Sequence, residues 1–192
     1  MKRLLLTTTF SLVATLANAH PETSHLDGIV SGLAHPIGGL DHVLAMTGVG
    51  LLGYVLGGCF RWLMPTAFVL MMIFGGVLAL VGIRLPATEI AIILSVTMIG
   101  SMIFASGRIS AGKALVAAGI FAVFHGHAHV AEMPIGSNLA GYTAGFLLMT
   151  GLLHALGLVL AAKAASFGGR PVLKAAGAVI AGTGFSILAG LF

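Results

Sequence analysis

Residues 113–132 read KALVAAGIFAVFHGHAHVAE, an apolar stretch of membrane-crossing length that carries three histidines and ends in a glutamate. Residues 35–42, HPIGGLDH, place two more histidines and an aspartate in a second apolar stretch. Ionisable side chains at bilayer depth are costly, and they are usually retained because they serve a ligand or a pathway. Imidazole and carboxylate together are ligands for divalent first-row metals. The two stretches therefore predict a membrane protein that handles a transition-metal ion.

The composition of the chain supports this class. Hydrophobic residues make up 58% of the sequence and charged residues only 7%, whereas about 25% of the residues in soluble domains are charged. So few charges could not cover the surface of a soluble fold. The chain has 28 glycines among 192 residues, and abundant small residues allow membrane helices to approach closely. The basic residues are scattered singly between apolar stretches, so we expect no nucleic-acid partner.

The N-terminal residues 1–19 have the features of a cleaved signal peptide. Two basic residues precede a short apolar run, which reaches ANA at residues 17–19. A basic segment, an apolar segment and small residues follow one another in this order in secretory signals. The apolar run is also too short for a membrane-spanning helix, which needs about 20 residues. An uncleaved first helix is the alternative. Cleavage would make His20 the new N-terminus, where its α-amine and ring can chelate a metal beside His25; a plain polar tail is the other interpretation.

The remaining residues 20–192 form one predicted membrane domain. Short turns rich in glycine, proline and charge divide it into apolar stretches that are each near the length needed to cross a bilayer. We place these stretches at 36–57, 63–82, 87–106, 113–131, 138–162 and 172–191. The predicted fold is all-α: a polytopic membrane protein with a six-helix transmembrane bundle after a cleaved signal peptide. Since the first and fourth helices each begin a block of three, we also expect a 3+3 inverted repeat.

The distribution of basic residues predicts the orientation of the bundle. Cytoplasmic loops carry an excess of Lys and Arg. With the mature N-terminus outside, the inner loops and their edges carry six basic residues, and the outer loops carry only Arg84. The inner ones are Arg61, Arg108, Lys113, Lys163, Arg170 and Lys174. We therefore expect a multi-pass protein of the bacterial inner membrane with both mature termini in the periplasm.

The spacing within the fourth stretch predicts a shared helix face. His125, His129 and Glu132 are spaced i, i+4 and i+7, so all three can point into one pocket. His127 lies about 200° away around the helix and should face elsewhere.

The first stretch supplies a matching set. His35 and His42 are seven residues apart and share a face. Asp41 is offset by about 100°, so it can either reach the metal from the flank or orient a ligating histidine. Pro36 suits a first helical turn, which predicts that the helix begins at His35. In the predicted orientation both sets fall in the outer half of the membrane, where they indicate a single site.

Two further ionisable residues leave alternatives open. Glu89 opens the third stretch at the outer face, where it serves either as a helix N-terminal carboxylate or as a site of ion capture. His154 lies near the middle of the fifth stretch, where a packing role and a functional role are both open.

The two motifs resemble those of the HupE/UreJ family. The first is His-x5-Asp-His, and the second is Phe-His-Gly-x-Ala-His followed by Glu. The residues that carry them are His35, Asp41 and His42, and then Phe124, His125, Gly126, Ala128, His129 and Glu132. The resemblance covers the whole chain, with a signal peptide, six spans and both motifs in the expected places. One departure is Val130, where the family usually has a second glycine; it bears on metal preference more than on function.

The resemblance implies both a function and a residue set. Members are bacterial permeases for nickel, with some cobalt-associated relatives, and often accompany hydrogenase or urease. It implies that His35, Asp41, His42, His129 and Glu132 are essential and that Glu89 and His125 are plausible members of the site.

Together these features predict a permease that imports Ni²⁺, or alternatively Co²⁺, from the periplasm and supplies hydrogenase or urease indirectly. The metal is the transported substrate, and we expect neither a cofactor nor catalytic residues. An intramembrane metalloenzyme and a haem-binding electron carrier are the competing interpretations, because both use buried histidines. The sequence leaves open the choice between nickel and cobalt, the coupling ion and the oligomeric state.

Overall fold

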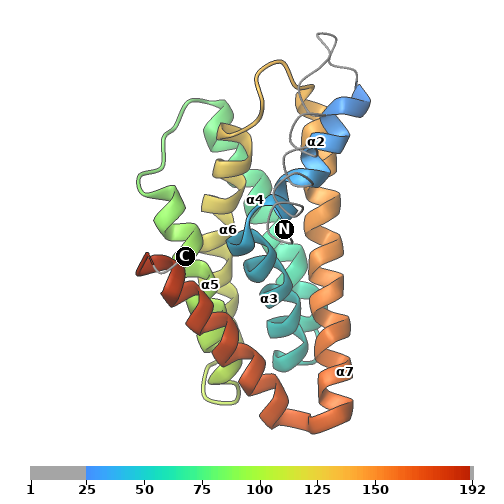
Figure 1. Ribbon diagram of the computed structural model, residues 1–192, viewed down its shortest axis with the longest axis vertical. Helices are drawn as coiled ribbons and strands as arrows, with labels where there is room; N and C mark the ends of the chain where they lie inside the picture. Colours follow the sequence, from blue (N-terminus) through green and yellow to red (C-terminus); the bar gives the residue numbers. More distant parts are fainter. Residues whose placement is uncertain (1–24, 191–192) are drawn as a thin grey trace, which may run out of the picture.

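The computed structural model describes residues 25–190, all of whose regular elements are helices that pack side by side (Figure 1). The predicted signal peptide and His20 lie outside the described residues. The helices are α2 (His25–Gly38), α3 (Leu40–Leu56), α4 (Phe60–Leu80), α5 (Thr88–Phe104), α6 (Ala111–Ala131) and α7 (Leu139–Leu188).

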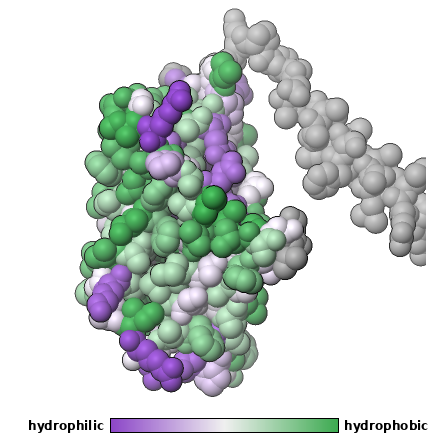
Figure 2. Space-filling model, turned by 90° about the vertical axis from the view of Figure 1, so that its left-hand side faces the viewer, coloured by the Kyte–Doolittle hydropathy of each residue, from purple (hydrophilic) through white to green (hydrophobic). Residues whose placement is uncertain are grey.

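Several of these helices are suited to a membrane. Within the described residues, α4, α6 and α7 are long and apolar enough to cross a bilayer, and α2 with α3 qualifies as a fourth span if the bent pair is counted as one. Large hydrophobic side chains face outward, including Trp62 at 74% exposure and Phe167 at 89%. Figure 2 shows a face that is hydrophobic over most of its height, with hydrophilic residues toward its two ends. An all-helical membrane protein is thus confirmed, whereas the number of six spans stays a prediction.

The first predicted span is broken, so the expectation of one helix over 36–57 beginning at His35 was wrong. Helix α2 ends at Gly38, α3 begins at Leu40, and the two are bent by 85°. Gly39 between them is extended, with φ −114° and ψ 127°. His35 lies in the last turn of α2 rather than at a helix start, and Pro36 lies inside that helix. Two adjacent glycines lower the cost of ending the helix here, because glycine is a poor helix former.

The last two predicted stretches are joined in α7, which turns sharply inside its length. Gly169 has φ 63° and ψ −148°, a left-handed φ that favours glycine. This residue lies between the predicted stretches 138–162 and 172–191, so the position of the turn was predicted correctly although the helical segments are longer. After Gly169 the chain runs back across the bundle toward α5 (Figure 1).

Close backbone contacts fix the helix that carries the second motif. A methyl group added at Gly126 of α6 would collide with the carbonyl oxygen of Met72 in α4, and one added at Gly75 of α4 would collide with the carbonyl oxygen of Val123. The two helices therefore meet backbone to backbone, as small residues permit in membrane bundles. This contact holds the histidine-bearing part of α6 in place.

Candidate metal site

Three histidines from three helices converge at the break between α2 and α3. His35 comes from α2, His42 from α3 and His129 from α6, and one ring nitrogen of each lies within 4.8 Å of the others. The ring centroid of His129 lies 4.8 Å from that of His35 and 4.9 Å from that of His42. We call these three residues the histidine triad. The 85° bend, rather than a shared face of one straight helix, brings His35 and His42 to the same point.

The triad is buried on one side and accessible on the other. His129 is fully buried, whereas the side chain of His35 is 23% exposed. A cavity of about 430 Å³ opens beside the break. It is lined by Ser31, Ala34, His35, Gly38, Gly39, Asp41, His42 and Glu132. An ion can therefore reach the triad from this end of the bundle.

Asp41 orients His42. Its Oδ1 lies 3.0 Å from Nδ1 of His42 and also accepts a hydrogen bond from the backbone N–H of His42 at 2.9 Å. Since an ionised carboxylate only accepts hydrogen bonds, Nδ1 carries the proton and Nε2 presents its lone pair. That Nε2 is buried and has no hydrogen-bond partner among the described residues. This is the arrangement in which a carboxylate fixes the tautomer of a metal-ligating histidine.

Glu132 lies beside the triad at the end of α6. It follows the last helical residue, Ala131, and its Oε2 lies 3.5 Å from Nε2 of His35. Partial burial raises the pKa of this carboxyl, and nearby His42 offsets that rise only in part. Glu132 lines a second cavity of about 340 Å³ together with Glu89 and His127. Glu132 thus lines both the triad cavity and this second cavity. Glu89 lies in the second cavity, outside the histidine triad.

The other two histidines of α6 point in different directions. The ring of His125 lies 5.4 Å from that of His42, one turn deeper than the triad. Its Nδ1 donates to the carbonyl oxygen of Phe121 at 3.0 Å, which leaves a buried Nε2 with no partner in the described part of the chain. His127 instead contacts the 81–87 loop, where its Nε2 lies 2.8 Å from the carbonyl oxygen of Ile83. The predicted divergence of His127 from its neighbours is therefore found.

Two aromatic residues of α7 complete the wall of the site. The Phe146 ring stacks on His129, with centroids 5.0 Å apart and planes 9° apart. The Tyr142 ring lies 5.9 Å from that of His35, and its buried hydroxyl has no partner within residues 25–190. Sequence reasoning missed both, because aromatic residues one turn apart on an apolar helix are also typical of core packing.

Comparisons with known proteins identify the family of the chain. A family model described as HupE / UreJ protein matches residues 8–187. The chain is 44% identical over 191 residues to a protein from Rhizobium leguminosarum bv. viciae named Protein HupE, covering 99% of this chain and 100% of the relative. No solved structure matches this chain. The chain therefore belongs to the HupE/UreJ family, a family of nickel and cobalt permeases and not of enzymes.

Proposed function

We propose that this protein carries Ni²⁺, or Co²⁺ in its place, across the bacterial inner membrane through the histidine triad. The observation that carries the proposal is the convergence of three imidazole nitrogens within 4.8 Å of one another. They come from segments almost 90 residues apart and meet where the first span is broken. Nitrogen and oxygen ligands suit both metals. Broken helices beside a substrate site are a recurring feature of transporters.

The residues around the triad have separate proposed roles. His35, His42 and His129 bind the ion, and Asp41 orients His42. Glu132 supplies a carboxylate at the mouth of the site. Glu89 shares a cavity with it, and we place Glu89 on the route by which the cation arrives.

The direction of transport follows from the predicted orientation. With the signal peptide 1–19 removed and both mature termini in the periplasm, the break and both cavities face the outer side. The ion is then taken from the periplasm, stripped of water by imidazole and carboxylate, and released to the cytoplasm. There it supplies the maturation of hydrogenase or urease.

We also propose that the bundle is a 3+3 inverted repeat, in which α3 corresponds to α6 and α4 to the part of α7 before Gly169. Two helix pairs support this. A methyl group at Gly50 of α3 would meet the carbonyl oxygen of His154, and one at Gly157 of α7 would meet that of Thr47. The contacts of Gly126 and Gly75 between α6 and α4 repeat this pattern. In both helix pairs, each glycine lies three residues after the carbonyl that the glycine of the opposite helix would meet. In the proposed repeat, the pair formed by α3 and the first part of α7 corresponds to the pair formed by α6 and α4, so the two pairs should have matching contacts.

The test is uptake of radiolabelled Ni²⁺ into proteoliposomes that contain the purified full chain. Wild type should accumulate Ni²⁺, His42→Ala should lose that uptake, and excess Co²⁺ should compete. Folded, correctly inserted wild type that takes up no metal under any imposed gradient would refute an autonomous permease. A coloured preparation with a haem spectrum would favour the electron carrier instead.

A further inference from the structure

His154 is a buried imidazole that the proposed transport site does not use. It lies on α7 with 2% of its surface exposed, and neither ring nitrogen has a hydrogen-bond partner among residues 25–190. A buried polar group without a partner costs free energy, so most such groups are paired. A neutral imidazole offers one N–H donor and one lone pair, and at His154 both are unused. A side chain kept for packing alone could be apolar at no such cost.

A continuous row of rings connects His154 to the triad. The His42 ring lies 5.4 Å from that of His125, and the Phe68 ring lies 5.5 Å from His125 and 5.3 Å from His154. Phe68 is fully buried on α4 and stands between the two histidines. Three imidazoles of this row, His42, His125 and His154, have a buried nitrogen with no partner within the described chain.

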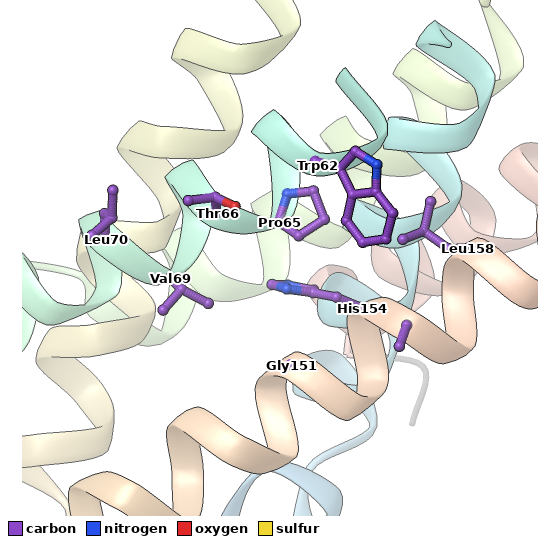
Figure 3. Close-up of a pocket in the computed structure, with 9 residues that line it drawn as sticks. Trp62, Pro65, Thr66, Val69, Leu70, Gly151, His154 and Leu158 are labelled. Carbon is purple, nitrogen blue, oxygen red and sulfur yellow. The ribbon is translucent and has the colours of Figure 1, made fainter. Parts of the chain in front are cut away.

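The row leads toward the end of the bundle opposite the triad cavity. His154 lines a third cavity of about 290 Å³ between α7 and α4. Figure 3 shows its ring extending from α7 toward α4, close to Pro65 and below Trp62, with the Thr66 hydroxyl on the same wall. Trp62 lies near the first residue of α4, Phe60, at the turn that joins α3 to α4. In the proposed orientation this turn is cytoplasmic.

We propose that His154 is a second metal-binding position, which receives the divalent ion from His125 and passes it inward. The inference rests on the proposed transport function and extends it from a site to a route. The ion leaves the triad, is held by the free Nε2 of His125, and moves past Phe68 to a ring nitrogen of His154. Phe68 must turn aside for each passage, so this ring separates the outer binding position from the inner one. The ligand class is a first-row divalent cation that accepts imidazole nitrogen.

Direct coordination at His154 is tested with a thiolate in its place. In a Cys59→Ser background, which removes the single native cysteine, His154→Cys is loaded with Co²⁺ and its near-ultraviolet spectrum is recorded. A thiolate bound to Co²⁺ gives a charge-transfer band that nitrogen and oxygen ligands do not give. The control is Ser95→Cys in the same background, because Ser95 is fully buried on α5, outside the row, and cysteine nearly matches it in size. We expect the band in His154→Cys and none in the control.

Transport is then measured with His154→Phe, which keeps an aromatic ring and removes both nitrogens. We expect Co²⁺ uptake to fall roughly tenfold or more, the scale on which even outer-shell partners of a metal act. Equilibrium Co²⁺ binding at the triad should persist, which also shows that the variant is folded. The matched control is Thr150→Val, which removes a buried hydroxyl one turn away on α7 and should transport normally.

Each outcome decides the question. A band in His154→Cys with impaired uptake in His154→Phe supports the relay. Absence of the band, or uptake in His154→Phe equal to that of Thr150→Val, overturns it. Impaired uptake without the band also overturns metal binding and assigns His154 to proton transfer or packing. If wild type neither binds nor transports Co²⁺, the proposed function has failed, and not the relay alone.

Discussion

The carboxylate of Asp41 holds the ring of the next residue, His42, through Oδ1 and Nδ1 at 3.0 Å, while the same oxygen accepts the backbone N–H of His42. This pairing occupies Nδ1 of His42 and leaves the lone pair of the buried Nε2 free. The contact between two adjacent residues thus determines which nitrogen of His42 is left available as a ligand.

Replacing Asp41 by Asn is expected to weaken metal binding without unfolding the protein. The amide is nearly isosteric but neutral, and it can donate as well as accept, so it no longer fixes the His42 tautomer. Loss of such a partner typically costs 10- to 100-fold in metal affinity, and we expect a rise in Kd for Ni²⁺ of about that size. Equilibrium binding to detergent-purified protein measures it. A Kd within about twofold of wild type would show that Asp41 has no orienting role.

The two glycines at the helix break should respond differently to alanine. A Cβ at Gly39 would lie 2.6 Å from Oδ1 of Asp41 and 3.0 Å from Nδ1 of His42, whereas a Cβ at Gly38 would meet no described atom within 4 Å. Gly39→Ala should therefore disturb the Asp41–His42 contact and reduce Ni²⁺ affinity, by about as much as Asp41→Asn. Gly38→Ala should leave the affinity near that of wild type. Equal affinities for the two variants would contradict the described geometry.

Much of this arrangement was predictable from sequence, and the rest depended on long-range geometry. The spacing of His125, His129 and Glu132 predicts one face of a helix, and that face does meet the residues of the first motif. The break at Gly39 was missed because Pro36 was assigned to a first helical turn, which put Gly38 and Gly39 inside the expected span, whereas Pro36 lies near the end of α2. Phe68 and Phe146 were missed because only the packing of α4 and α7 brings their rings against histidines.

Backbone contact between α4 and α6 should make Gly126 intolerant of a side chain. The carbonyl of Met72 occupies the place of a Cβ there, so Gly126→Ala must separate the helices. We expect a loss of about 1–3 kcal/mol in stability, the usual range for overpacking. Thermal unfolding in detergent measures this loss as a lower Tm. Gly112→Ala on the same helix meets no described atom within 4 Å and should not lower the Tm; a similar fall in both variants would argue against the close contact.

Acidic pH should reduce uptake, and Glu132 should account for part of the effect. Metal binding requires neutral imidazoles and ionised carboxylates. Because the pKa of Glu132 is raised above its ordinary value of 4.5, this carboxylate loses its charge at a higher pH than an ordinary glutamate as the medium is acidified. Glu132→Gln lacks the charge at every pH, so the uptake of wild type should exceed that of the variant at neutral pH and approach it as pH falls. A constant ratio of the two rates across the pH series would exclude a role for the Glu132 charge.

Binding of the transported ion by the histidine triad can be tested with a matched pair of variants in the α6 sequence HGHAH. His129 belongs to the triad, whereas His127, two residues earlier, contacts the carbonyl of Ile83 on the other side of the helix. The most direct measurement is Ni²⁺ binding and uptake for His129→Ala beside His127→Ala, both as full chains in proteoliposomes. We expect His129→Ala to lose both activities and His127→Ala to retain most of both. Retention of binding and uptake by His129→Ala would show that the triad does not bind the transported ion.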